Sequence, residues 1–154
     1  MKRFYLMTML LLSLCAISAQ AQTQDRPTTD GPVWRIVYLR SKPGTRADYI
    51  KFLREHYKPL FDEGKKQGLI LDYKFFTKPT SDGPNDWDIA NATLFRNYAD
   101  ALDFSEERSN KYNEISLKHY GTAEARTKLS EQFRQLSDFV SIQYMREMIL
   151  TPIK

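Results

Sequence analysis

The stretch Val33-Trp-Arg-Ile-Val-Tyr-Leu-Arg40 decides the fold class. It is rich in β-branched and aromatic residues and stops at Lys42-Pro43-Gly44, so it predicts a strand over residues 33–40. Both alternating sets of positions carry large apolar residues: Trp34, Ile36 and Tyr38 on one, and Val33, Val37 and Leu39 on the other. A half-solvated antiparallel sheet would show one polar set. We therefore expect both faces of this strand to be covered.

A helix is expected directly after this strand. Apolar residues recur at helical spacing over residues 49–60, which is typical of an amphipathic helix. Thr45 and Asp48 have capping-box spacing, so we expect the Thr45 side chain to accept a hydrogen bond from the Asp48 amide. Pro59 lacks an amide hydrogen and predicts a kink or restart, and Gly68 predicts the end of the helix.

The remaining pattern contains two strands, a helical region and a last strand. Residues 69–77 and 87–95 are expected to pair as an antiparallel hairpin with a long, turn-rich loop. The helical region divides into three predicted helices at 97–104, 106–120 and 122–137, and the last strand is predicted at 139–150. The order β-α-β-β-α-β, with a lengthened second helical region, predicts an α+β fold of the ferredoxin-like class. Its four-stranded antiparallel sheet would carry helices on one face.

The second face of that sheet has no cover within the chain. All four predicted strands carry large apolar residues on both alternating sets, and no spare segment is left to shield the outer set. The simplest cover is the same face of another copy. We therefore predict a homodimer joined through the sheets.

The first 21 residues have the organisation of a secretory signal peptide. Lys2 and Arg3 precede a 12-residue apolar run, and Ala19-Gln20-Ala21 supplies small residues at the −3 and −1 positions of a peptidase site. The sequence thus predicts cleavage after Ala21 and a bacterial protein in the periplasm or the medium. Residues 22–32, polar with two prolines, are expected to be a flexible tether to a single domain over 33–150.

Composition excludes several classes of protein. The 154 residues are 42% hydrophobic and 27% charged, enough for one core. Removal of Lys2 and Arg3 from 23 basic residues leaves 21 against 19 acidic ones, a balance of +2, so no nucleic-acid partner is expected. No second apolar run approaches a membrane span. Cys15 is the single cysteine and lies in the signal region, which excludes thiol catalysis, cysteine zinc sites and iron–sulfur clusters in the mature chain.

The sequence resembles the dimeric α/β-barrel superfamily, and within it small exported proteins of unassigned function. The matching motifs are Lys42-Pro43-Gly44 after the opening strand, Tyr57-Lys58-Pro59-Leu60 in the first helix, Gly68-Leu-Ile-Leu-Asp-Tyr73 and Asp86-Trp87-Asp88. The resemblance covers most of residues 34–149. It implies a cavity between sheet and helices in each subunit. Members include cofactor-free monooxygenases, haem-degrading enzymes and dye-type peroxidases, but no catalytic residue of these branches matches here and none is carried over.

Five polar residues are the candidates for lining such a cavity. His56 lies on the stripe of the first helix, Tyr112 and His119 share one face of a later helix, Asn91 interrupts an apolar strand, and Tyr38 offers a hydroxyl from the opening strand. These neutral, amphipathic groups favour a planar, weakly polar ligand. A structural role is the more common explanation for each: a partly buried or surface histidine, or a satisfied core network.

Three functions remain open from the sequence. The first is an exported dimer that binds a small, largely apolar molecule without catalysis. The second is an oxygenase-type enzyme, cofactor-free or with haem, for which His119 would be the better iron ligand. The third is a structural or interaction module. No cofactor is predicted, and no metal either, because the histidines lack paired spacing and the Asp82, Asn85, Asp86 and Asp88 loop favours turn formation over calcium binding.

Overall fold

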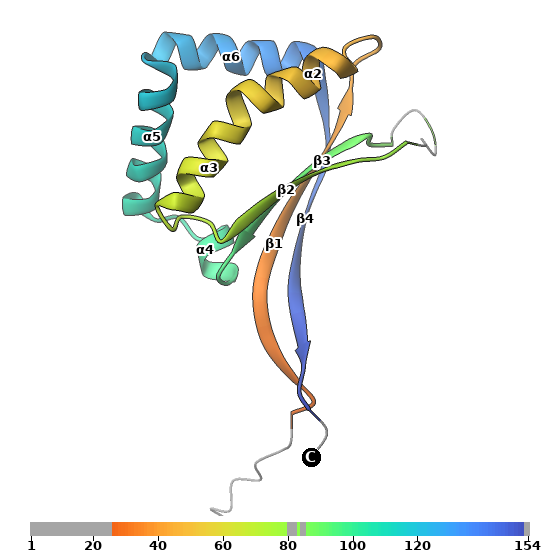
Figure 1. Cartoon of the computed structure of the whole chain (residues 1–154), viewed down its shortest axis with the longest axis vertical. Coiled ribbons are helices and arrows are strands. Elements are labelled where there is room, and N and C mark those ends of the chain that lie inside the picture. The colour runs from red at the N-terminus through yellow and green to blue at the C-terminus, as the bar shows by residue number, and fades with distance from the viewer. Residues whose placement is uncertain (1–25, 80–82, 84–85, 153–154) are drawn as a thin grey trace, which may run out of the picture. The chain divides into compact units, whose positions relative to one another are not determined.

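One antiparallel sheet forms the base of the structure. Its four strands are β1 (Thr28–Ser41), β2 (Asp72–Thr77), β3 (Ile89–Phe95) and β4 (Ser137–Leu150), in the spatial order β2-β3-β1-β4 (Figure 1). β3 pairs antiparallel with both β1 and β2. β3 lies between β1 and β2, and these two strands are joined by a helical crossover. This is the split β-α-β arrangement, so the predicted α+β, ferredoxin-like fold is confirmed.

The computed structural model describes residues 26–79, 83 and 86–152. Residues 30–149 form one compact unit, and the sites discussed below all belong to it. The predicted signal peptide, its cleavage site, Cys15, and the loop residues Asp82 and Asn85 lie outside the described residues.

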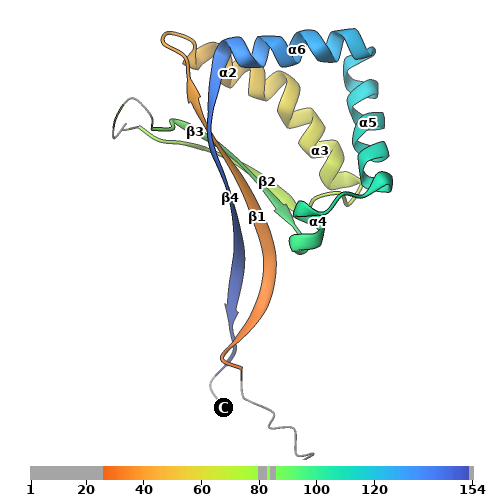
Figure 2. The same cartoon turned by 180° about the vertical axis from the view of Figure 1, so that it is seen from behind.

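Six helical segments lie on one face or at one end of this sheet, as Figures 1 and 2 show from opposite sides. They are α2 (Arg46–Phe52), the π-helical turn η2 (Leu53–Tyr57), α3 (Lys58–Lys66), α4 (Tyr98–Leu102), α5 (Glu106–Tyr120) and α6 (Ala123–Leu136). The bounds of α5 agree with the predicted ones because Ser105 caps its first turn and Gly121, at φ +81°, ends it.

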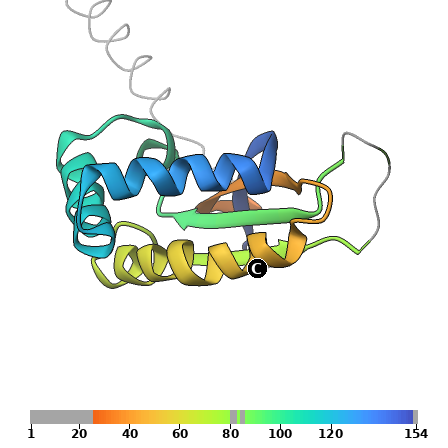
Figure 3. The same cartoon turned by 90° about the horizontal axis from the view of Figure 1, so that it is seen from above.

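The core forms where the helices cover one row of strand side chains. Val33 and Leu39 of β1 are 0% and 2% exposed, and Leu39 is paired with the equally buried Ile89 of β3. Tyr49 of α2 and Leu53 of η2 pack onto this row. From above, α6 and the α2–α3 segment run over the sheet with β3 visible between them (Figure 3). The Tyr49 ring meets Phe133 of α6 edge-on at 5.7 Å, which joins the two helical arms.

The alternate row of strand residues faces away from the helices. Ile36, Ala92 and Lys74 are neighbours on β1, β3 and β2, as are Tyr38, Ala90 and Phe76. No described element lies over this row. Phe76 is 45% exposed, whereas the small Ala90 is shielded between its larger neighbours.

Thr45 does not act as the predicted helix cap. Its side chain makes no bond to the amide of Asp48. Instead, the Thr45 hydroxyl lies 2.7 Å from the Leu136 carbonyl and 2.9 Å from the Lys42 carbonyl. The Leu136 carbonyl also accepts from the Lys42 amide at 2.9 Å. The loop after β1 is therefore fastened to the junction between α6 and β4, a partner that lies 91 residues away.

The predicted interruption near Pro59 is present, one turn earlier than the proline itself. Residues 53–57 form a π-helical turn, and the Lys58 amide donates to the carbonyl of Leu53, five residues back. Pro59 then occupies the first turn of α3, where its missing amide hydrogen breaks no helical bond.

Several strand ends differ from their predicted positions. β1 begins at Thr28 rather than Val33, within the segment expected to be a tether, because it also pairs with β4. Gly31 permits the close approach of these two strands, since an added Cβ would lie 2.9 Å from the Cβ of Glu147. β2 begins at Asp72 rather than Leu69. Leu69 is buried, but its amide donates to the Gly64 carbonyl at the end of α3 instead of to a strand.

The Thr45 hydroxyl provides a test of the closure between the loop after β1 and the α6–β4 junction. We expect Thr45→Val to lower the free energy of unfolding by about 1 kcal/mol, because it removes this hydrogen bond and leaves the shape nearly unchanged. Thr45→Ser keeps the hydroxyl and should retain most of the stability. Denaturant titrations of the three proteins measure the difference, and equal stability of Thr45→Val and the parent protein would contradict the role of this bond.

Candidate functional site

A cleft opens between the sheet and the segment that carries α4 and α5. Its volume is about 360 Å³, close to the lower end of the range for small-molecule sites, roughly 300–1,000 Å³. The floor comes from Arg35 of β1 and from Thr93 and Phe95 of β3. Phe61 of α3 and Tyr112 of α5 supply aromatic walls. The cleft thus has the location that the family resemblance implied, between helices and sheet.

Arg35 is the outstanding polar group of this cleft. It occupies the helix-facing row of β1, paired with Thr93, in line with the buried Val33 and Leu39. Its guanidinium carbon lies 5.5 Å from the centre of the Phe95 ring. Its Nε is buried without a hydrogen-bond partner in the described part of the chain, and no carboxylate of that part forms an ion pair with it. Arg35 is partly buried and the described residues supply no carboxylate partner for it, so its guanidinium is available to pair with an anionic ligand.

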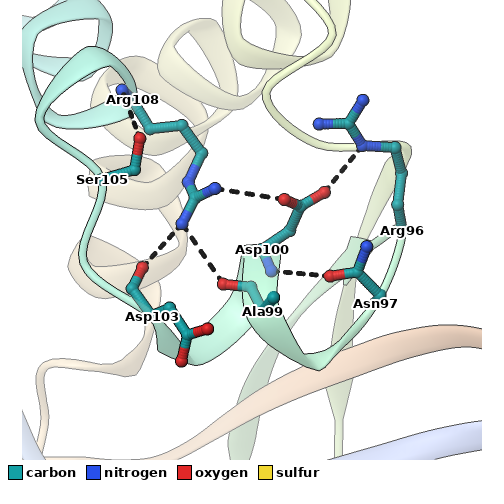
Figure 4. A network of polar contacts seen from close by, with 7 residues as sticks. All are labelled: Arg96, Asn97, Ala99, Asp100, Asp103, Ser105 and Arg108. Atoms are coloured by element: carbon teal, nitrogen blue, oxygen red, sulfur yellow. Dashed lines mark hydrogen bonds and ion pairs between the residues drawn. The ribbon is translucent and has the colours of Figure 1, made fainter.

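Arg108, the other cation of the cleft, forms three hydrogen bonds within the fold (Figure 4). Its guanidinium donates to the Asp100 carboxylate at 3.1 Å and to the carbonyls of Asp103 and Ala99 at 2.6 and 3.2 Å. Asp100 also accepts from Arg96 at 2.7 Å, and its amide donates to the Asn97 side chain at 2.8 Å. Arg108 therefore fastens α4 to the start of α5, and Arg35 is left as the cation available to a ligand.

Tyr112 contributes a phenol to the polar lining, which also includes Asp100, Asp103, Ser105 and Ser109. Burial raises the pKa of its phenol, and the positive charges of Arg35 and Arg108 partly offset that rise. The hydroxyl is therefore neutral at physiological pH and can donate a hydrogen bond. Tyr112 is the one residue of the five predicted ones that lines this cleft.

The two histidines lie together, but away from this cleft. The rings of His56 and His119 are 6.2 Å apart, and His56 also packs against Phe52 at 4.8 Å. Burial lowers the pKa of His56, and the neighbouring His119 lowers it further. His119 is exposed and borders a small depression of about 210 Å³ with Pro59 and Lys118. The structure thus brings these two predicted residues to each other without joining them to the other three.

Asn91 faces the helices and lies inside the core. It is 6% exposed, and its Oδ1 has no hydrogen-bond partner in the described part of the chain. The hydroxyl of Tyr49 is also buried, which raises the pKa of that phenol, and its interactions with the Ser137 and Asn91 side chains partly offset the rise. Asn91 does not line the cleft, although its neighbour Thr93 on the same row does.

Tyr38 lies on the other side of the sheet. Its hydroxyl is 3.3 Å from the side-chain oxygen of Gln143 on β4, and its ring packs against Trp87 at 4.9 Å. The pleat places Tyr38 and Arg35 on opposite faces of β1. Tyr38 therefore belongs to the uncovered row and not to the cleft.

A metal centre finds no support in the side-chain arrangement. Among the residues that the structure describes, no three of His, Cys, Asp and Glu are grouped as metal ligands. In the acidic loop, Asp86 pairs with Lys78, and Asp88 accepts from the Ser41 amide at 2.8 Å. Both carboxylates therefore form contacts with other residues of the fold.

Arg35 was missing from the predicted site, although the sequence carries a signal for it. The alternate set that contains Val33, Val37 and Leu39 is predicted to be apolar, and Arg35 is its exception. An arginine within an otherwise apolar, buried row of strand residues indicates a position where a charge is retained under the helices. That exception identifies the cleft better than any of the histidines.

No protein-family model matches the chain, and no curated protein matches it. Among solved structures, the chain is similar to a dimeric ferredoxin-like protein from an uncultured marine organism, with 12% identity and a TM-score of 0.44. The alignment covers 80% of this chain and 92% of that one. The fold described here rests on strand order and register.

In the described ranges, none of the helices combines the length and the apolar content that a bilayer crossing requires.

The network around Arg108 generates a prediction about the cleft wall. Arg108→Met should lower the free energy of unfolding by about 2 kcal/mol, because it removes bonds to Asp100 and to two carbonyls at a mostly buried site. Arg96→Met removes the other arginine on Asp100, but that side chain is 64% exposed and its loss should cost about 0.5 kcal/mol or less. Denaturant unfolding compares the two, and equal losses would show that Arg108 does not hold α4 to α5.

Proposed function

We propose that this protein is an exported, homodimeric binding protein for a small monoanion with an apolar, preferably aromatic, body. The observation that supports it most is Arg35, a half-buried guanidinium without an anionic partner in the described residues, at the floor of an aromatic-walled cleft. The sequence favours a planar, weakly polar ligand because its five candidate residues are neutral and amphipathic. Arg35 changes that expectation, since it introduces one positive charge from the sheet.

The cleft favours a carboxylate over a multiply charged group. Arg108 is occupied by Asp100 and two carbonyls, so a single guanidinium is left to receive the ligand. A guanidinium binds a carboxylate through two parallel hydrogen bonds, and such charge-assisted bonds are strong when partly buried. The Phe61 and Phe95 rings would contact the ligand body, and the neutral Tyr112 hydroxyl would donate to a second polar group. We assign no reaction to the cleft.

Export and self-association complete the proposal. The signal-peptide pattern of residues 1–21 supports delivery across the bacterial inner membrane. The row of Ile36, Tyr38 and Phe76 that no described element covers supports pairing of two copies through this face. On edge strand β4, Met145 lies two residues from Gln143, the contact of Tyr38, so it shares the uncovered face, and it is 46% exposed.

Arg35 is tested with benzoate and its uncharged analogue benzamide. We expect benzoate to shift the amide resonances of Thr93, Phe95 and Tyr112 in a saturable manner, and benzamide to shift them only weakly. Arg35→Met should weaken the benzoate response at these residues at least about tenfold, because it removes a charge-assisted contact. Arg35→Lys keeps the charge but loses the planar fork, and should give an intermediate affinity.

Arg96→Met is the matched control, because it removes an exposed arginine outside the cleft lining. It should leave the benzoate response unchanged. The melting temperature of Arg35→Met should equal or exceed that of the parent protein, since a half-buried charge without a partner destabilises the empty protein. A benzoate response at Thr93, Phe95 and Tyr112 that is unaffected by Arg35→Met would refute the proposed function.

The homodimer is tested by light scattering at micromolar concentration. We expect twice the mass of the mature chain, with an interface burying at least about 1,000 Å². Phe76→Glu should produce monomers, because it places a charge on the uncovered face. Leu117→Glu on α5 is the control, since Leu117 is equally exposed, at 45%, but lies on the helical side. A monomeric parent protein, or a Phe76→Glu variant that remains dimeric, would contradict pairing through the sheet.

A further inference from the structure

A second cavity lies within the helical layer and is separate from the Arg35 cleft. Its volume is about 340 Å³, and its lining comes from α2, η2, α3, α6 and the end of α5. It shares no lining residue with the cleft. Neither the sequence interpretation nor the proposed function assigns it a role.

Two phenols provide the hydrogen-bonding groups of this cavity. Tyr57 and Tyr120 both line it, and neither hydroxyl has a hydrogen-bond partner in the described part of the chain. Burial raises the pKa of Tyr57 to about 12, with a smaller contribution from the neighbouring Tyr120. Tyr120 is also shifted upward by burial. Both phenols therefore stay protonated at physiological pH and can donate a hydrogen bond.

Aromatic rings form the apolar part of the same cavity. The Tyr57 ring is stacked on Phe133 of α6, with centroids 5.5 Å apart and planes 25° apart. Phe52 lies 5.9 Å from Tyr57 and 6.1 Å from Phe133. The rings hold Tyr57 in place, so its unpartnered hydroxyl has a fixed position. A planar ligand would find flat apolar surfaces beside that donor.

Two arginines of α6 give the cavity its charge. Arg126 donates to the Asn113 side chain at 3.2 Å, whereas Arg134 has no ion pair or hydrogen bond in the described part of the chain. They are eight residues apart on the helix, or about 12 Å along its axis, so they border different ends of the cavity. No carboxylate contributes to the lining. The cavity therefore favours an anion.

The π-helical turn positions Tyr57 at the cavity. Tyr57 is the last residue of η2, and the extra residue in this turn changes the direction of the side chains that follow Phe52. π-helical turns are rare and occur frequently at functional sites. Pro59 explains why the helix is interrupted in this region. It does not explain why the Tyr57 hydroxyl lacks a partner, and that hydroxyl is an independent indication that the turn serves a ligand.

We propose that the cavity between η2, α5 and α6 is a second ligand site, for a planar aromatic anion whose oxyanion receives hydrogen bonds from Tyr57 and Tyr120. The ring system lies beside Phe52, Tyr57 and Phe133, and an α6 arginine neutralises the charge. The site does not depend on Arg35. It can therefore be tested whether or not the proposed function is correct.

The test uses 2-naphthoate as the probe and the Arg35→Met protein as the parent, so that the sheet-side cleft is disabled. Calorimetric titration should show saturable binding of 2-naphthoate, and the uncharged 2-naphthylmethanol should bind more weakly. The double variant Tyr57→Phe/Tyr120→Phe keeps both rings and should lose at least about tenfold in affinity for 2-naphthoate. Circular dichroism verifies that each variant is folded.

Tyr73→Phe is the control variant, because Tyr73 lies outside the cavity and its hydroxyl binds Asp62 at 2.5 Å. It should leave the affinity for 2-naphthoate unchanged. Absence of saturable binding in Arg35→Met, or equal affinity in the double tyrosine variant, overturns the second site. Either result leaves the benzoate response of the Arg35 cleft as a separate measurement. If Arg35→Met does not fold, Arg35→Gln serves as the parent.

Discussion

Burial of one row of strand side chains beneath the first helical segment is the constraint on which the other features depend. Leu39 and Ile89, at 2% and 1% exposure, lie side by side on β1 and β3 under Tyr49 and Leu53. Loss of this contact would expose large apolar surfaces of both layers at once. Because the same row continues to Arg35, the sheet pairing that builds the core also fixes the guanidinium at the floor of the cleft.

Polar contacts complete the structure at the two ends of this apolar layer. At one end, the Thr45 hydroxyl and the Lys42 amide meet the Leu136 carbonyl, which joins the loop after β1 to the start of β4. At the other end, Arg108 joins α4 to α5. The second contact explains how one cleft can hold two arginines with different roles: Arg108 satisfies its donors within the fold, and Arg35 does not.

The order of elements could be predicted from the sequence because its signals are local. Ser105 and Gly121 delimit α5 within their own neighbourhood, and the apolar periodicity on either side needs no knowledge of the tertiary structure. Thr45 could not be assigned correctly in this way. Its spacing to Asp48 is that of a cap, but its actual partner is contributed by a residue 91 positions later. The predicted signal peptide and homodimer stay predictions, since no described contact tests them.

The candidate site was harder to predict because a cavity forms where side chains leave space unfilled, and this depends on the tertiary structure. His56 lies on η2 with its ring against Phe52, and Asn91 lies in the core under the helices, but only Tyr112 of the five predicted residues borders the cleft. Periodicity identifies the face on which a residue lies, whereas a binding site needs polar groups that the fold leaves unsatisfied there. Arg35 meets that condition on the sheet through its buried Nε, and Tyr57 lines the second cavity with a hydroxyl that has no partner among the described residues. A charged or phenolic residue inside an apolar row is therefore the more informative signal in this sequence, because burial there lowers stability until a ligand supplies the missing partner.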